Sequence, residues 1–336
     1  MFVLGSDITI GGFKKVKPHE VKITKSVHEY VDRAFIHVPT TARLQRAGEV
    51  ITESVDTAKQ FKEGDFVKID LGYNGKLVNE FKGFVTKINF KTPIEVECEG
   101  YSYQLRKNQY LKVFKNTKLI DILNFLIADT DITINNKHVS DVMITKLVLQ
   151  KNNGVEALEM IKKMLNNLVK IYFQGSVMCA ELFPVVPFKE TAFYKLGWNV
   201  IKDDSLKLKE PKNEDITVVY KHTSVDGTRM KGTHKLKQIV TKGKAIGNGE
   251  TKEVKSSIKD EATLSKLAKA DANKQSYKGY EGKIKTFLQP YCEPAWKASI
   301  TDAKYPERSG IYLIESTEVT YGMSGARRTV GIGIKL

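Results

Sequence analysis

The N-terminal part of the chain alternates between apolar and polar residues, which is the pattern of β-strands with one buried face. This pattern predicts a strand over residues 66–73 and a return strand over residues 76–90. The Asn74-Gly75 pair between them favours the positive φ angles of a tight hairpin turn. Gly83, inside the return strand, predicts a bulge or a sharp bend of the kind that small barrels need at their corners.

The next predicted strand, residues 94–103, completes a meander that we expect to curl or close. Its apolar positions face a core, and the alternate positions are carboxylates that face outward: Glu95, Glu97 and Glu99. We expect lysines of neighbouring strands, such as Lys82 and Lys87, to pair with them at a few tenths to about 1 kcal/mol per pair. The row could equally face lysines of another subunit. A catalytic carboxylate pair is the alternative, but the surrounding sequence supplies no partner acid, base or metal ligand.

A helical period replaces this alternation in the middle of the chain. Leucine and isoleucine recur at helical spacing over residues 119–129, after an N-cap predicted at Asn116 and Thr117. A second amphipathic helix is predicted over residues 155–168, and it leads into a β-hairpin over residues 169–183. These elements predict a small α/β unit between two β regions.

Strand patterning returns in the last part of the chain, with glycines at its turns. One helix interrupts it, predicted near residues 260–274. The predicted fold class is therefore α+β, mainly β. We expect a first β domain at residues 1–106, an inserted α/β domain at residues 107–195, and a second β domain at residues 196–336 that contains the helix as an insertion.

The net charge of +15 is the outlier in a composition that is otherwise typical of a globular protein, with 41% apolar residues. Between Lys221 and Lys244 there are seven basic residues and one acidic residue, Asp226. This segment predicts either contact with a phosphate-rich partner or a solvated strand face. Because nearly all its cations are lysines, which lack the bidentate geometry that recognises bases, sequence-specific binding of nucleic acid is not expected.

The sequence predicts a soluble intracellular product without membrane insertion. Its first residues lack a basic region followed by an uninterrupted apolar stretch, so no signal peptide is predicted. No segment approaches the roughly 20 apolar residues needed to cross a bilayer. The cysteines are odd in number and far apart, which predicts free thiols in a reducing compartment: Cys98, Cys179 and Cys292.

No spacing in the sequence identifies a catalytic, cofactor-binding or metal-binding residue. The six histidines never fall two to a helical turn. The run from Gly322 to Gly325 resembles part of a nucleophile elbow, but a strand is predicted after it, so a hairpin loop is favoured. Four aromatic residues are candidates for a stacking platform, although such residues are more often core or interface anchors: Trp198, Trp296, Tyr101 and Tyr103.

Four features, taken in order and made of five stretches, resemble a known family and cover most of the chain. They are the strand pair FKGFVTKINFKTPIEVECEGYSYQL, the helix-to-strand units TKLIDILNFLIADTDITI and GVEALEMIKKMLNNLVKIYF, the helix DEATLSKLAKADANKQ, and the terminal strands GIYLIESTEVTYGMSGARRTVGIGIKL. This order resembles the baseplate hub proteins of contractile phage tails: the late control protein D family, the Mu-like tail protein family, and the hub part of type VI secretion spike proteins. The chain departs from the pattern in a shortened region at residues 291–310, and it has no attached lysozyme or needle domain.

The resemblance implies two small β-barrels similar to tail-tube subunits, one at each end of the chain, with the α/β block decorating the outside. Three chains would form a ring with pseudo-sixfold symmetry that joins the hexameric tail tube to the trimeric spike. The implied partners are two further copies of the chain, the tube protein and the spike protein. The basic residues, those of segment 221–244 among them, would then either line the lumen through which DNA and the tape-measure protein pass or contact acidic neighbouring proteins. The implied location is the baseplate of a virion tail, assembled in the bacterial host cytoplasm.

Hub proteins act by assembly, so neither enzymatic activity nor a cofactor is expected. Two alternatives remain. A tail-tip hydrolase acting on cell-wall polysaccharide would need a carboxylate pair set in a cleft. A nonspecific nucleic-acid-binding protein would show DNA affinity that falls steeply with salt.

Overall fold

The computed structural model describes residues 3–45, 52–203, 205–210, 217–230, 233–245 and 250–336, and over these residues the protein is α+β and mainly β, as predicted. The N-terminal strands are β1 (Leu4–Ile10), β2 (Glu20–Ser26), β3 (Arg33–Val38), β4 (Thr41–Gln45), β5 (Thr52–Asp56), β6 (Phe66–Tyr73), β7 (Lys76–Asn89) and β8 (Ile94–Glu99). The middle elements are β9 (Gln109–Lys118), α1 (Leu119–Ile127), β10 (Thr133–Val139), β11 (Met143–Asn153), α2 (Gly154–Met164), β12 (Val169–Gln174) and β13 (Val177–Leu182). The remaining elements are β14 (Thr191–Lys195), β15 (Val200–Lys202), β16 (Lys207–Lys209), β17 (Thr217–Met230), β18 (Thr233–Ala245), β19 (Thr251–Lys255), α3 (Glu261–Ser276), β20 (Gly279–Thr286), β21 (Lys297–Thr301), β22 (Gly310–Gly322) and β23 (Gly325–Lys335). Short 3-10 helices cover Thr57–Lys59, Tyr101–Arg106 and Pro306–Arg308.

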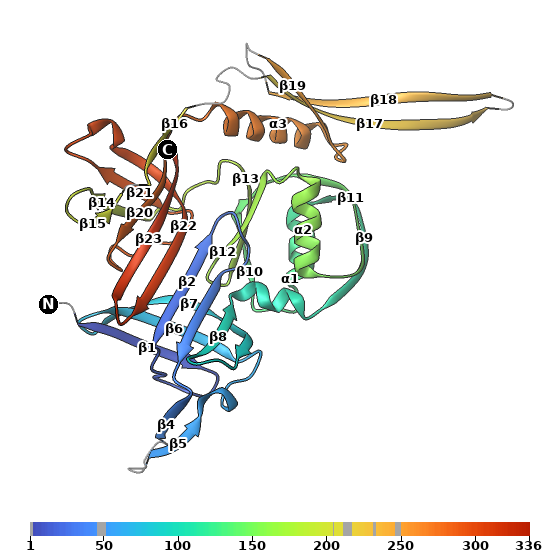
Figure 1. Ribbon diagram of the computed structural model, residues 1–336. Coiled ribbons are helices and arrows are strands. Elements are labelled where there is room, and N and C mark those ends of the chain that lie inside the picture. Colours follow the sequence, from blue (N-terminus) through green and yellow to red (C-terminus); the bar gives the residue numbers. More distant parts are fainter. Residues whose placement is uncertain (1–2, 46–51, 204, 211–216, 231–232, 246–249) are drawn as a thin grey trace.

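The two ends of the chain share one large sheet. Its main path is β1-β6-β7-β8-β3-β2-β22-β23-β20-β15, with β21 on β22 and β14 on β21. The halves meet where β2 pairs antiparallel with β22, from Glu20 opposite Gly322 to Ser26 opposite Ser316. Figure 1 shows this seam, with blue β2 beside red β22. A backbone ladder therefore joins opposite ends of the sequence.

Each half of this sheet packs on its own apolar core. The N-terminal core contains Ile94, Val96 and Cys98, so the buried face predicted for that strand is confirmed. The C-terminal core is built around residues such as Tyr312 and Ile332 of the last two strands. In strands that alternate apolar and polar residues, the apolar side chains lie on the face that packs on a core and the polar ones lie on the other face, as is common in antiparallel sheets.

The middle of the chain packs its helices on short sheets. α1 and α2 bury their apolar stripes beside β12 and β13, and all four elements contribute to one core. α3 joins this core through Leu264 and Leu267, and Figure 1 places it between the α/β unit and the long β17–β18 hairpin. The antiparallel pair β9–β11 also lies here. The sequence did not predict β9, because most of its side chains are exposed and show no alternation. The division of the chain into domains at residues 106 and 195 stays a prediction.

The predicted N-cap of α1 is wrong. β9 runs on to Lys118, so the helix begins directly at Leu119. Asn116 has a φ of 47°, whereas an N-cap residue takes an extended conformation. The Thr117 hydroxyl donates to the Lys115 carbonyl instead of accepting from the helix.

α2 is shorter than predicted and has a complete capping box. The Asn153 side chain accepts from the Glu156 backbone N–H at 2.9 Å, and the Glu156 carboxylate accepts from the Asn153 N–H at 3.1 Å. The helix ends at Met164 because Asn166 and Asn167 follow with φ values of 53° and 56°. Left-handed asparagines of this kind terminate helices.

Two hairpin predictions are confirmed. Asn74 and Gly75 have φ values of 52° and 76° and join β6 to β7. Gly322 pairs with Gly325 across the last turn, so this run is a β-hairpin and not a nucleophile elbow.

The predicted bulge at Gly83 lies elsewhere on β7. The ladder shifts register next to Glu80, which has no partner residue on β6, and again between Val85 and Lys87. Gly83 instead lies against the neighbouring strand, since a Cβ there would be 2.2 Å from the Glu99 carbonyl oxygen. Close approach of two backbones is therefore what requires this glycine.

Candidate functional site

A polar pocket of about 380 Å³ lies at the seam between the two ends of the chain. The N-terminal half contributes Lys25 and Asp32, the α/β unit contributes Gln174, and the C-terminal half contributes Glu293 and Trp296. Because three separate parts of the sequence line it, the pocket forms only in the complete fold.

Arg328 of β23 lies fully buried beside this pocket. Its Nη2 donates to Oε1 of Glu80 on β7 at 2.6 Å, and the two side chains are 1% and 3% exposed. Its Nε and Nη1 donate to the carbonyls of Leu288 and Cys292 at 3.1 and 3.3 Å. Burial is the largest influence on the pKa of Arg328 and would lower it, but the charge and hydrogen bond of Glu80, together with Cys292 and Tyr194, raise that pKa overall, so the guanidinium stays charged.

A second buried ion pair crosses the same seam. Lys25 Nζ donates to both carboxylate oxygens of Glu293, at 2.7 and 3.0 Å. The Tyr291 hydroxyl also donates to Glu293, and the Arg328 guanidinium lies 5.1 Å from the centre of the Tyr291 ring. Burial is the largest influence on the pKa of Lys25 and would lower it, but Glu293, Asp32 and Glu80 together raise that pKa overall. The two ion pairs therefore form one network.

Asp32 is a further titratable group beside this network and is 7% exposed. Burial raises the pKa of its carboxyl to about 7, although the positive charge of Lys25 opposes that rise. Glu293 adds to the rise because two carboxylates near each other resist double ionisation. The backbone holds Asp32 in place, since its carbonyl accepts from the Gly100 N–H at 2.8 Å.

Two carboxyl groups, those of Asp32 and Glu293, thus line one pocket, which is the minimum that glycoside hydrolysis requires. A nucleophile or general base needs a free lone pair directed at substrate. Both oxygens of Glu293 are instead occupied by Lys25, and one of them also by Tyr291. The arrangement is that of an ion network that fixes three segments against one another.

The sequence did not single out these seam residues, although a signal for one of them exists. Arg328 falls in phase with Ala326, Val330 and Ile332, all of which are buried. A charged residue in the apolar phase of a strand indicates a buried ion pair. Glu80 gives no such signal, because it lies at the register shift of β7 and the alternation breaks there.

The outward row of carboxylates is only partly as predicted. Glu95 contacts His37 Nε2 and Lys91 Nζ, both at 2.9 Å. The hydrogen bond with His37, followed by that with Lys91, lowers the pKa of Glu95 to about 2. The predicted pairs with Lys82 and Lys87 are absent from the described part of the chain, because the facing strand β3 and the β7–β8 turn supply nearer partners.

Glu99 does not face outward, and the strand does not continue to Tyr103. The strand ends at Glu99, and after Gly100 the chain turns into a 3-10 helix. Glu99 is 7% exposed and accepts from the Ser102 hydroxyl at 2.8 Å and from Arg106 Nε at 3.1 Å. It therefore caps this turn from inside the fold.

The four candidate aromatic residues do not form one platform. Tyr101 and Tyr103 pack against Phe84, with ring centroids 5.9 and 5.4 Å away. Trp296 packs on the C-terminal core, and Trp198 lies apart with 78% of its surface exposed. Three of the four are thus anchors within the fold.

The basic segment 221–244 lies on the β17–β18 hairpin, which projects away from the rest of the molecule in Figure 1. Lys221 contacts Glu253 of β19. Lys231, and the side chains of the other basic residues of the segment, lie outside the described residues, so their proposed place in a lumen stays a prediction.

The cysteines are buried free thiols, as predicted. Within the described ranges, no group of His, Cys, Asp and Glu side chains is placed to hold a metal ion. No helix in the described part of the chain is long and apolar enough to span a membrane.

By sequence, the chain matches no family model and no curated protein. By structure, it matches the 43 kDa tail protein of prophage MuSo2 from Shewanella oneidensis, with a TM-score of 0.60 and 13% identity over 99% of this chain and 98% of that one. It also matches the tail protein from Neisseria meningitidis MC58, with a TM-score of 0.61 and 11% identity over 98% and 96% of the two chains. A third match is the E. coli c3393 protein, described as a component of the type VI secretion system with structural similarity to the T4 tail proteins gp27 and gp5. Its TM-score is 0.54 at 9% identity, over 98% of this chain and 76% of that one.

The chain therefore has the fold of prophage tail proteins, from one end to the other. The resemblance inferred from the order of sequence motifs is confirmed at the level of the fold.

Proposed function

We propose that this chain is a structural baseplate hub protein of a phage or prophage contractile tail. The observation that supports the proposal is the end-to-end match to a prophage tail protein and to a second bacterial tail protein, in which nearly the whole of both compared chains is covered. A fold alone does not fix a function, so the proposal also draws on the seam.

In this proposal each half of the large sheet corresponds to one tube-like barrel, and β2–β22 joins the two barrels side by side. Three copies then present six similar modules in a ring, which matches a hexameric tube on one face and a trimeric spike on the other. Strands β1 and β15 lie at the two ends of the main path of the large sheet. Free strand edges of this kind can continue a sheet into the next copy.

The same proposal assigns partners and location. The tube protein and the spike protein would bind opposite faces of the ring, while DNA and the tape-measure protein pass through its lumen. The protein would act in the virion tail after assembly in the host cytoplasm. Type VI secretion spikes are a related setting, since one structural match is a component of that system.

The proposed role involves no catalytic turnover, and the seam pocket offers the direct test of the hydrolase alternative. A hydrolase would use Asp32 as acid and Glu293 as base or nucleophile, so Asp32→Asn would abolish release of sugar from purified peptidoglycan. We expect the wild-type protein to release none above the level of a heat-denatured sample. Release that disappears in Asp32→Asn would establish the hydrolase instead.

Multi-angle light scattering tests the assembly directly. We expect a particle of about three times the chain mass of 37.9 kDa, alone or after addition of the cognate spike protein. Negative-stain images should then show a ring with an open centre. A protein that stays monomeric at every concentration, with and without the spike, would contradict the hub role.

A further inference from the structure

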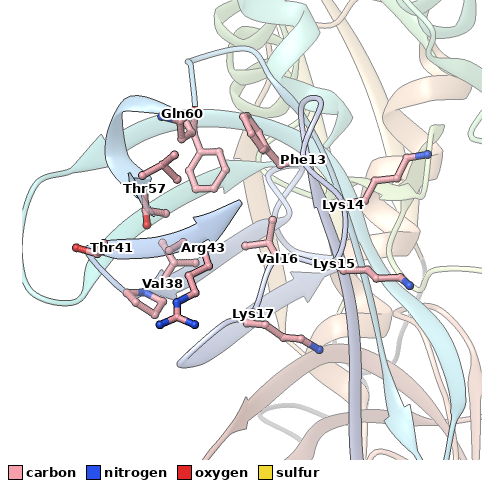
Figure 2. Close-up of a pocket in the computed structure, with 14 residues that line it drawn as sticks. Phe13, Lys14, Lys15, Val16, Lys17, Val38, Thr41, Arg43, Thr57 and Gln60 are labelled. Atoms are coloured by element: carbon pink, nitrogen blue, oxygen red, sulfur yellow. The ribbon is translucent and has the colours of Figure 1, made fainter. Parts of the chain in front are cut away.

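A second pocket lies at the far end of the N-terminal half, between the loop of residues 11–17 and the β4–β5 hairpin (Figure 2). Its volume of about 340 Å³ falls in the range of about 300–1,000 Å³ that is typical of ligand pockets. The floor is apolar and includes Val16, Val38 and Phe61. We refer to it as the cationic pocket, because of the rim described next.

Four cations belong to the lining of this pocket: Lys14, Lys15, Lys17 and Arg43. In Figure 2 the three lysine side chains extend outward from their loop, away from the apolar floor, and so form an outer rim. None of the fourteen residues that line the pocket is acidic. Among the residues that the structure describes, none of the four cations has an ion-pair partner. Their charge is therefore available to an anionic group that approaches the pocket.

The walls of the pocket are held by the backbone. Val16 N–H donates to the Ile8 carbonyl at 2.9 Å, which fixes the lysine-bearing loop to β1. Thr57 N–H donates to the Thr40 carbonyl at 3.0 Å, which fixes the opposite wall. A pocket that is formed in advance loses less entropy when a ligand binds.

Thr57 supplies a polar group inside the pocket. Its side chain is buried, with 4% of the residue exposed, and its Oγ1 has no hydrogen-bond partner. Buried hydroxyls normally have one, because an unsatisfied polar group is costly. A carboxylate or a peptide carbonyl entering the pocket would accept a hydrogen bond from the Thr57 hydroxyl.

The β4–β5 hairpin adds an edge on which an extended chain can pair. In the described part of the protein these two strands pair only with each other. Their outer edges therefore present backbone N–H and C=O groups next to the pocket, and peptides bind such edges as an added strand.

We propose that the cationic pocket docks an extended segment of another protein that carries both apolar and acidic side chains. The apolar side chains fill the floor, the acidic ones meet the rim, and the main chain lies along the hairpin edge. Nucleic acid fits less well, because the floor is apolar and its two phenylalanine rings, Phe13 and Phe61, pack edge to face on each other at 5.9 Å instead of forming a stacking platform. This inference goes beyond the proposed hub role and does not depend on ring formation.

Fluorescence anisotropy with a synthetic peptide tests the proposal. The probe is a short fluorescein-labelled peptide in which leucine and phenylalanine alternate with glutamate, and its matched control carries lysine in place of each glutamate. We expect the glutamate peptide to bind, with affinity that falls as salt is raised, and the lysine peptide not to bind.

Charge reversal locates the site. Replacing Lys14, Lys15 and Lys17 together by glutamate should weaken binding of the glutamate peptide by about tenfold or more. The matched control reverses three exposed lysines of the α/β unit, Lys115, Lys146 and Lys151, and should leave binding within about twofold of wild type. Both triple variants change the net charge equally, so nonspecific attraction affects them alike.

A third variant tests the Thr57 hydroxyl without changing the charge of the pocket. Thr57→Val keeps the shape of the side chain and removes the hydroxyl, so it should weaken binding of the glutamate peptide while leaving the protein folded. Equal binding of the two peptides, or an equal loss in the two triple variants, would overturn the proposal. So would absence of peptide binding together with binding to phosphatidylglycerol vesicles, since that result would identify a lipid surface instead.

Discussion

Replacing Arg328 by methionine tests whether the buried ion pair holds the two ends of the chain together. Methionine keeps an apolar stem of similar length, but it leaves the Glu80 carboxylate 3% exposed and without its cation. Removing one member of a buried pair costs about 3–5 kcal/mol, because the other charge stays buried and unpaired. Arg328 also donates to the carbonyls of Leu288 and Cys292, so we expect the upper part of that range.

Two comparisons separate the effect of leaving a buried charge unpaired from the effect of any substitution at the seam. In the double variant Arg328→Met with Glu80→Leu both charges are gone, and most of the stability should return, because a buried pair is often replaced by apolar residues at little cost. The exposed pair Lys22–Glu318 crosses the same β2–β22 seam at 3.2 Å with side chains 47% and 39% exposed. Lys22→Met should therefore cost only about 0–1 kcal/mol.

Urea unfolding followed by circular dichroism gives the free energies, provided that all variants share one slope with denaturant. A domain is stable by only about 5–15 kcal/mol, so the loss in Arg328→Met should be visible as a large shift of the midpoint. The reasoning fails if Arg328→Met costs no more than Lys22→Met, or if the double variant is no more stable than the single one.

Three further predictions concern single positions, and the same unfolding assay measures each of them. Because the pKa of Asp32 is about 7 in the fold against 3.8 ordinarily, stability should fall as pH rises from about 4 to about 7, by up to roughly 4 kcal/mol, and Asp32→Asn should remove that fall. Gly83→Ala should destabilise by about 1–3 kcal/mol, because its Cβ would be 2.2 Å from a carbonyl oxygen, while Gly12→Ala, with nothing within 4 Å, should be neutral or slightly stabilising. Thr57→Val should stabilise by about 1 kcal/mol, because it removes an unsatisfied buried hydroxyl. The explanation for Asp32 would be contradicted if the stability of Asp32→Asn fell with pH as steeply as that of the wild type. The explanation for Gly83 would be contradicted if the two glycine changes had equal effects, and that for Thr57 if Thr57→Val lost stability.

The elements that the sequence predicted well are those determined by neighbours along the chain. The β6–β7 hairpin follows from alternation and from the Asn74-Gly75 pair, and both are local signals. β9 escaped prediction because its side chains are mostly exposed, so no periodic face exists to find. The end of β8 at Glu99 was not predicted, because the partners that hydrogen-bond this carboxylate inside the fold, Ser102 and Arg106, lie beyond the strand.

The seam could not be predicted, because no local pattern says that the second strand pairs with the next to last. Arg328 could have been noticed as a charge in the apolar phase, but its partner Glu80 lies at a register shift that alternation does not show. The cationic pocket was equally hidden, since Lys14 and Arg43 line one pocket only after β1 and the β4–β5 hairpin are in place.

The ion network at the seam has a role that stability alone does not explain. Buried ion pairs add little net stability, yet they are satisfied in only one arrangement. A slip of β2 against β22 by two residues would keep every apolar side chain on its own face but move the strands by about 6.5 Å. That shift would break contacts of 2.6 and 2.7 Å, at Arg328–Glu80 and Lys25–Glu293.

We therefore infer that the network fixes the register between the two halves. A ring built from several copies needs the same register in every copy. If so, the double variant Arg328→Met with Glu80→Leu should recover most of the wild-type stability and still assemble poorly. Light scattering on that variant should show a smaller trimeric fraction than wild type at equal concentration, while Lys22→Met, at the same seam, assembles normally. A double variant that assembles like wild type would show that the backbone ladder alone sets the register, and the buried charges would then have no part in assembly.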